Sequence, residues 1–180
     1  MPYFHASRNV YQIGDVIRVP VGEQSHAFKL SLELGMQWRE EALENARNDR
    51  ANSRRSAVYA ANTLGNAARF LVSQPDEKGR PVLGYEVEIT HQTPSPMVLI
   101  GYIDAHGPAF PSLSACMEEY WTPTKKWRFL EFVCPSLTVT AVFENICEEK
   151  LWMAGEDYEH DRQLARQLWG PTPVKRTERK

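Results

Sequence analysis

The stretch FLEFVCPSLTV, residues 129–139, predicts a buried strand, a Pro-Ser turn and a second strand. Glu131 places a single carboxylate among the aromatic and aliphatic residues of the first strand. An acid in such a strand is either a rim residue that faces water or a charge that acts on something beside it. The remaining segments of the chain help to separate these two interpretations.

The composition is typical of one soluble globular domain. The chain has 180 residues, enough for a single core, with 42% hydrophobic and 24% charged residues. Its formal net charge of −2 argues against binding of nucleic acid or a membrane through the charge of the whole domain. A local basic patch is still compatible with that charge.

The sequence carries no signal for a membrane or for an oxidising compartment. No apolar run reaches the length of a membrane span, and the first residues, MPYFHASRNV, lack the basic start and apolar centre of a secretory signal. The three cysteines are widely spaced and form no CxxC pair, which favours neither a disulfide framework nor a zinc site. We therefore expect a cytoplasmic protein without a metal. Delivery into another cell by machinery that needs no signal peptide stays open.

Hydrophobic periodicity and turn residues predict many short strands. Strands are expected at PYFHAS (2–7), GDVIRVPV (14–21), SAVYAA (56–61), LGYEVEI (83–89), MVLIGYID (97–104), WRFLEFV (127–133) and LTVTAVFENI (137–146). The run at 97–104 is apolar almost throughout, which indicates a strand covered on both sides.

Helices are expected between these strands and at the end of the chain. They are predicted within 25–56, at 62–73 with Asn62 or Thr63 as the cap, at 112–121, and at 156–170 with its end at Gly170. Within 25–56 the glutamates come early and Arg47, Arg50, Arg54 and Arg55 come late, an order that suits the helix dipole and a solvated helix end. The prediction is one mixed α+β domain over 1–170, followed by a disordered basic tail, PTPVKRTERK, at 171–180.

Three separated segments combine into a candidate site. His5 lies in YFHAS, Tyr59 ends a strand that leads directly into the helix of Phe70, and Glu131 lies in LEFVCPSLTV. Each residue taken alone has an ordinary structural explanation. The histidine would be a surface residue and the aromatic residues core. The acid would face water at a sheet edge, where Glu144 is equally available.

Taken together, the order and setting of these motifs resemble the H-Y-E class of ADP-ribosyltransferases, which includes diphtheria toxin, the poly(ADP-ribose) polymerases and the rifampin ADP-ribosyltransferases. His-Ala-Ser in YFHAS is similar to the H-G-S of the polymerases. AVYAANTLGNAARF matches the length of their second motif without a gap, and EFVCPSLTV is similar to their third. The resemblance covers most of residues 3–143 and rests on short motifs whose test is their structural context.

The resemblance implies an ADP-ribosyltransferase-like fold, with two small antiparallel sheets and flanking helices around a cleft for NAD. In that fold Glu131 would bind the ribose 2′-hydroxyl and stabilise the positive charge of the oxocarbenium-like transition state. His5 would bind the adenosine ribose with Ser7 as a second polar contact. The backbone of Ala6 would pair with the nicotinamide carboxamide.

The resemblance also assigns Tyr59 and Phe70 to the two faces of the nicotinamide ring. Such stacking is worth about 0.5–1.5 kcal/mol per aromatic pair beyond the area it buries. Two positions depart from the polymerase pattern. Ala6 adds a methyl group where those enzymes have glycine, and Ala67 replaces a helix serine that binds the carboxamide.

The expected function is that of a mono-ADP-ribosyltransferase that uses NAD as co-substrate and releases nicotinamide. The acceptor stays open between a protein, a nucleic acid and a small molecule, as does a role as toxin, effector, phage protein or resistance enzyme. Nucleic acid would be contacted through Arg47, Arg50, Arg54, Arg55 and the basic tail. The alternative is an inactive module that binds NAD, ADP-ribose or a partner. An RNA 2′-phosphotransferase is a third candidate, although its arginine-rich signature is not evident.

Overall fold

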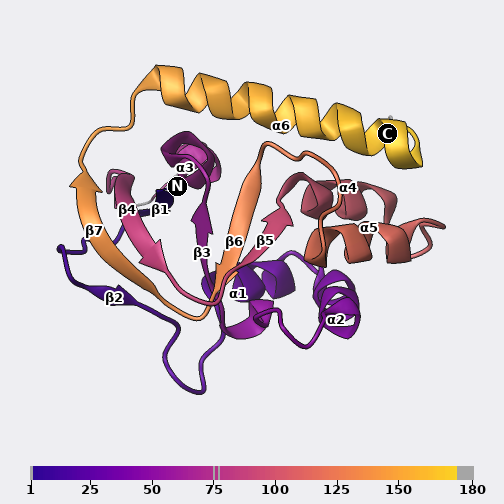
Figure 1. Ribbon diagram of the computed structural model, residues 1–180, viewed down its shortest axis with the longest axis horizontal. Helices are drawn as coiled ribbons and strands as arrows, with labels where there is room; N and C mark the ends of the chain where they lie inside the picture. Colours follow the sequence, from indigo (N-terminus) through magenta and orange to yellow (C-terminus); the bar gives the residue numbers. More distant parts are fainter. Residues whose placement is uncertain (1, 75, 77, 174–180) are drawn as a thin grey trace.

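The computed structural model describes residues 2–74, 76 and 78–173. Its strands form one antiparallel sheet in the order β2-β7-β4-β1-β3-β6-β5 (Figure 1). The strands are β1 (Tyr3–Ser7), β2 (Val16–Ile17), β3 (Val58–Ala61), β4 (Leu83–Ile89), β5 (Thr93–Pro96), β6 (Leu130–Cys134) and β7 (Leu137–Phe143). The helices are α1 (His26–Glu33), α2 (Gln37–Ala46), the 3-10 turn η1 (Arg54–Ser56), α3 (Leu64–Val72), α4 (Val98–His106), α5 (Leu113–Trp121) and α6 (Glu148–Trp169). The mixed α+β class is therefore confirmed.

The expected pair of separate sheets is not confirmed, because β1 bonds to a strand on each side. It pairs with β4 along its whole length, from Tyr3↔Val87 to Ser7↔Leu83. It pairs with β3 only at Phe4↔Ala61. A single pair of residues thus joins the β2-β7-β4-β1 half of the sheet to the β3-β6-β5 half.

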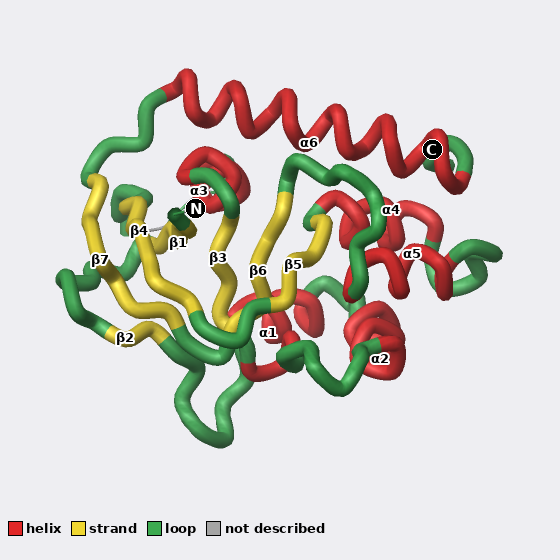
Figure 2. Tube along the Cα trace, viewed as in Figure 1, coloured by secondary structure: helices red, strands yellow, loops and turns green. Residues whose placement is uncertain are grey.

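The helices cover the sheet on several sides. In Figures 1 and 2, α6 crosses the top of the molecule and packs on α3 and α4, while α1 and α2 lie below the sheet and α4 and α5 lie beyond β5. α2 also contacts α5. None of the helices in the described ranges is both long and apolar enough to span a membrane.

The strand predicted at 97–104 is wrong, since that segment forms α4. Its apolar residues surround the helix axis, and Leu99 and Ile103 are fully buried. A short apolar run of this kind does not by itself distinguish a buried strand from a buried helix. The strand of this region is instead TPSP, β5, which sequence patterning missed because proline is unfavourable in strands other than at an edge.

The predicted helical region 25–56 is interrupted. α1 ends before Gly35, whose φ of +70° is a left-handed conformation that favours glycine, and α2 follows. The helix at 62–73 is confirmed as α3, with Thr63 rather than Asn62 as the cap, since its side chain accepts from the Asn66 backbone N–H. The C-terminal helix ends before Gly170 as predicted but begins earlier, at Glu148. Most of the predicted disordered tail, residues 174–180, lies outside the described residues.

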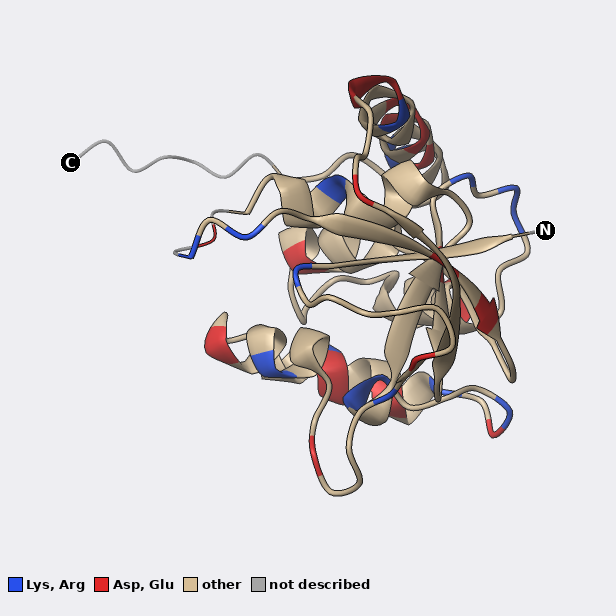
Figure 3. Cartoon of the chain, turned by 90° about the vertical axis from the view of Figure 1, so that its left-hand side faces the viewer, with Lys and Arg blue, Asp and Glu red and all other residues tan. Residues whose placement is uncertain are grey.

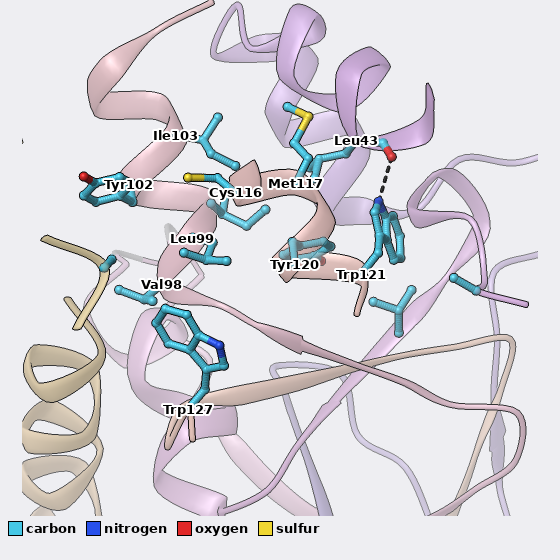
Figure 4. Packing of buried hydrophobic residues seen from close by; sticks show 14 of the residues in the cluster. Leu43, Val98, Leu99, Tyr102, Ile103, Cys116, Met117, Tyr120, Trp121 and Trp127 are labelled. Atoms are coloured by element: carbon cyan, nitrogen blue, oxygen red, sulfur yellow. Dashed lines mark hydrogen bonds between the residues drawn. The ribbon is translucent and has the colours of Figure 1, made fainter. Parts of the chain in front are cut away.

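The strand β6 separates two apolar clusters, since successive side chains of a strand point to opposite faces. Val133 packs in the larger cluster with α2, α4 and α5, and Phe132 and Cys134 pack in the smaller one with β4 and β7. Figure 4 shows the larger cluster, in which the Trp121 indole N–H donates to the Leu43 carbonyl at 2.7 Å. Glu131 and Val133 are two residues apart in β6, so their side chains point to the same face, which is the side of the larger cluster.

The contact between α3 and α6 yields a stability prediction. A Cβ on Gly65 would lie 2.1 Å from the Lys150 carbonyl oxygen, which the backbone of α6 holds in place. We expect Gly65→Ala to destabilise the fold by about 1–3 kcal/mol in denaturant unfolding, because the two helices must separate. Gly155→Ala in the same interface is the matched control. Its new Cβ would meet only the movable end of Arg69, and an equal loss in both variants would contradict this account.

Candidate functional site

The structure brings His5, Tyr59 and Glu131 to the wall of one pocket of about 210 Å³. They come from β1, β3 and β6, which are consecutive neighbours in the sheet. Phe70, on α3, lines the same pocket. Side chains that are far apart in the chain therefore meet because the sheet order places their strands next to one another.

A larger groove of about 740 Å³ adjoins this pocket. His5, Ala6 and Tyr59 line both hollows, while Ser7 lines only the groove. The Ser7 hydroxyl accepts a hydrogen bond from the backbone N–H of Asn9 at 3.0 Å. Together the hollows lie in the size range of ligand sites, about 300–1,000 Å³.

The pocket lies where the sheet opens. If the β1–β3 ladder continued past Phe4↔Ala61, Ala6 would stand opposite Tyr59, but these two residues are not register partners. Instead, the His5 Nδ1–H donates to the Tyr59 carbonyl oxygen at 2.8 Å. The opening thus exposes strand backbone to the hollow and satisfies part of it with a side chain.

His5 is held in one tautomer. Because a carbonyl only accepts, Nδ1 carries the proton, and in the neutral ring Nε2 is left as an acceptor. Burial lowers the pKa of His5 below its ordinary value of 6.5, against the opposing effect of the bond to Tyr59. The ring is therefore neutral at pH 7 and offers Nε2 to a hydroxyl donor.

Glu131 is 8% exposed and bound through one oxygen. Its Oε1 accepts from Arg54 Nη1 at 2.8 Å and from the Tyr120 hydroxyl at 2.5 Å. Within the described part of the chain Oε2 has no hydrogen-bond partner. Protein atoms do not fully enclose this oxygen, and Glu131 lines the pocket. Its neighbours across the two ladders, Ala61 and Ser95, are small and leave room for the carboxylate. Glu131 is therefore a paired acid at a pocket wall, whereas Glu144 is exposed.

Arg54 is the residue of this site that sequence reasoning misjudged. A place in an exposed basic helix end was expected, but Arg54 is 3% exposed and lies in the 3-10 turn before β3. Its Nε donates to Glu40 Oε2 at 3.0 Å, and its guanidinium lies over the Tyr59 and Tyr120 rings. Burial disfavours its charge, but the tyrosines and both carboxylates outweigh burial and raise the pKa of Arg54, so the cation persists.

A second arginine extends this charged cluster into α2. Arg39 donates to Glu40 Oε1 at 2.7 Å and to Asp104 Oδ2 at 2.5 Å. Burial works to raise the pKa of Glu40, yet Arg54 and Arg39 outweigh burial and hold that pKa below its ordinary value of 4.5. One signal could have indicated Glu40, since it stands three residues before Leu43 on the apolar face of the helix. The type of residue alone gave no sign that Arg54 would turn inward.

The two aromatic candidates differ in their surroundings. Burial raises the pKa of the Tyr59 hydroxyl in spite of Arg54 beside it, so the hydroxyl stays protonated and donates to the Arg54 carbonyl at 3.1 Å. The Phe70 ring lies 5.8 Å from the rings of Phe129 and Tyr158. Each candidate thus packs on one side against protein and lines the pocket with another part.

The departure at Ala67 has a polar neighbour that the sequence did not single out. Ala67 and Asn66 both line the pocket. Asn66 is 3% exposed, and its Nδ2 donates to Asn62 Oδ1 at 2.8 Å. This bond fixes the orientation of the amide and leaves Asn66 Oδ1 a buried acceptor with no partner within the described residues.

The remaining arginines of the expected basic surface differ in their exposure and in their partners. Arg47 pairs with Glu44 at 3.2 Å, while Arg50 and Arg55 are exposed. Figure 3 shows acidic and basic residues next to one another on the helices in its lower part. The end of the basic tail lies outside the described residues. Arg54 is buried and lines the pocket rather than an exposed basic surface, and a nucleic-acid contact through these arginines stays a prediction.

No protein-family model matches the chain, and no curated protein matches it. Within residues 2–74, 76 and 78–173, no cluster of three or more histidine, cysteine or acidic side chains is placed to hold a metal ion.

The Glu40 contacts predict a pH-dependent stability difference. Because the folded pKa of Glu40 is lowered, its charge stabilises the fold above pH 4.5, and this contribution is lost as the pH falls through the folded value. We expect Glu40→Gln to cost about 3–5 kcal/mol at pH 7, since two buried arginines lose their counter-charge. In denaturant unfolding the difference from wild type should shrink below pH 4.5.

The exposed neighbour supplies the control for this prediction. Glu41 bonds only to Gln37 among the described residues, at the surface of α2. Glu41→Gln should change the free energy of unfolding little, both at pH 7 and below pH 4.5. A deficit of Glu40→Gln that stays constant down to pH 3 would show that the loss of a hydrogen-bond acceptor, rather than the loss of charge, is responsible.

Proposed function

We propose that the chain is an NAD-dependent mono-ADP-ribosyltransferase with an ADP-ribosyltransferase-like fold. The observation that carries the proposal is the meeting of His5, Tyr59 and Glu131 at one pocket beside a larger groove. Three residues chosen from separate motifs of a known class would not be expected to share a hollow unless the segments were arranged as in that class.

In this proposal the nicotinamide and the ribose attached to it occupy the smaller pocket, which Glu131 lines, and the rest of the dinucleotide lies in the groove. Tyr59 and Phe70 contact the two faces of the ring. The β1 backbone at Ala6, which β3 leaves unpaired, binds the carboxamide. Asn66 Oδ1 accepts from the carboxamide N–H, a bond that the serine replaced by Ala67 would have supplied in the polymerases.

Bond cleavage requires stabilisation of positive charge on the ribose. The bond between the nicotinamide nitrogen and the ribose C1′ breaks, the bonding pair leaves with nicotinamide, and C1′ acquires oxocarbenium character. Glu131 Oε2 accepts from the ribose 2′-hydroxyl and faces the developing charge, and an acceptor nucleophile then bonds to C1′ and passes its proton to water. A carboxylate fixed in a largely dry site stabilises that charge more than one in water. His5 Nε2 accepts from a hydroxyl of the adenosine ribose.

The first test replaces the carboxylate. Glu131→Gln should lower nicotinamide release by about 100- to 1,000-fold, because the charge that stabilises the transition state is removed. The amide oxygen still accepts from Arg54 and Tyr120, so the fold and NAD binding should remain. Glu144→Gln is the control, because Glu144 is an exposed acid directly after β7. Equal rates in wild type and Glu131→Gln would remove Glu131 from this role.

A second test concerns the stacking ring. Tyr59→Ala should raise the KM for NAD by about 2- to 10-fold, the equivalent of one lost aromatic contact. Tyr59→Phe keeps the ring and loses only the hydroxyl bond to the Arg54 carbonyl, so its KM should stay near that of wild type. If both variants raise KM alike, the hydroxyl rather than the ring is the group that matters.

The alternative is a module that binds NAD or ADP-ribose without turnover, and Ala67 is the residue that favours it. Incubation of the protein with NAD labelled in the adenosine and with a cell lysate separates the two. Label fixed to protein, nucleic acid or a small molecule identifies a transferase and its acceptor class. Retained NAD binding without nicotinamide release identifies the inactive module.

A further inference from the structure

Arg54 touches both of the residues that the proposed reaction depends on most. Its Nη1 donates to Glu131 Oε1 at 2.8 Å, and its carbonyl oxygen accepts from the Tyr59 hydroxyl at 3.1 Å. The Tyr120 hydroxyl donates to the same Glu131 oxygen at 2.5 Å. Arg54 Nη1 also donates to Tyr120, so Arg54, Tyr120 and Glu131 form a closed triangle.

Arg54 is itself held at four points outside this triangle. Its Nε donates to Glu40 at 3.0 Å, and its backbone N–H donates to Glu44 at 2.9 Å. Its carbonyl accepts from the Ser25 hydroxyl at 2.7 Å and from Tyr59. A guanidinium bound at both ends and stacked between rings has little freedom to change rotamer.

We propose that Arg54 and Tyr120 are positioning residues that hold Oε1 of Glu131, so that Oε2 is presented to the ribose in the pocket. This inference rests on the proposed function and adds to it two residues on segments outside the three motifs. Tyr120 does not line the pocket and Arg54 does, and both act on the reaction through Glu131.

The arrangement answers a difficulty of the proposed chemistry. A glutamate has several rotatable bonds, and an unfixed carboxylate would have to be ordered during the reaction, at a cost in rate. A cation beside Glu131 would weaken its effect on a positive transition state. Glu40 binds the other side of the same guanidinium and offsets that charge, so the negative charge of Glu131 remains available to the pocket.

The decisive variant is Tyr120→Phe, which removes one donor to Oε1 and keeps the ring in the core. We expect kcat for nicotinamide release to fall by about 10- to 100-fold, the loss of one charge-assisted hydrogen bond, with KM within about twofold of wild type. Tyr102→Phe is the matched control, because Tyr102 is equally buried but donates to the Gly170 carbonyl. If loss of the hydroxyl only destabilised the fold, the fraction of folded protein would fall in both variants and kcat per folded molecule would stay unchanged.

Arg54→Lys tests whether two separate N–H donors of the guanidinium are needed to bind Glu40 and Glu131 together. A single ammonium cannot reach Glu40 and Glu131 in the geometry that Nε and Nη1 provide, so kcat should fall further than in Tyr120→Phe. In the background of Glu131→Gln, Tyr120→Phe should cause no additional loss of kcat, because its effect passes through the carboxylate. An undiminished, additive loss would overturn the proposal.

A readout without turnover separates failure of this inference from failure of the proposed function. In protein labelled with ¹³C at the glutamate carboxyl carbons, the Glu131 resonance is identified by its absence from Glu131→Gln. It should move in Tyr120→Phe and stay in place in Tyr102→Phe. If wild type releases no nicotinamide, the proposed function fails and this resonance alone decides the positioning. The positioning inference is overturned if the Glu131 resonance does not move in Tyr120→Phe. It is also overturned if the kcat of Tyr120→Phe equals that of the wild type.

Discussion

The single residue pair between β1 and β3 is the constraint on which the arrangement of the site depends. Antiparallel neighbours normally lie about 4.8 Å apart along a ladder, which leaves no space between their backbones. Here the ladder stops after Phe4↔Ala61, and the strands separate at Ala6 and Tyr59. The carbonyl left open on Tyr59 is satisfied by His5. Both hollows border this opening, so the same irregularity that joins the halves of the sheet also creates the site.

Burial of charge beside the opening is tolerated because every ion has partners. Isolated, a buried carboxylate or guanidinium would cost several kcal/mol. Arg54 stands between Glu40 and Glu131, and Arg39 stands between Glu40 and Asp104. The cluster connects α2 to β6 through charge rather than through apolar contact. Such a cluster fixes the direction of side chains more sharply than a hydrophobic contact of equal size, because hydrogen bonds depend on angle.

The parts of the fold that sequence predicted are those in which local pattern and tertiary setting agree. β4 alternates apolar and polar residues, and α3 has both a cap and an apolar stripe, so their type was clear. α4 was predicted wrongly because its buried apolar residues, Val98, Leu99, Ile100, Tyr102 and Ile103, lie on several sides of the helix and leave no helical periodicity. The pocket residues could be chosen from motifs, yet nothing in the order of residues fixes which arginine of a run turns inward. Arg54 is buried because Glu40 and Glu131 arrive from other elements, and that information is tertiary.

The two outer strands of the sheet have a consequence for the behaviour of the protein at high concentration. An open sheet edge presents unpaired N–H and C=O groups on which another chain can build a strand. At one edge, β5 reads TPSP, and its two prolines remove alternate donors from the backbone. At the other, β2 extends over only Val16–Ile17. Each outer strand is therefore short or interrupted by proline, and neither is itself a long template for intermolecular β-pairing.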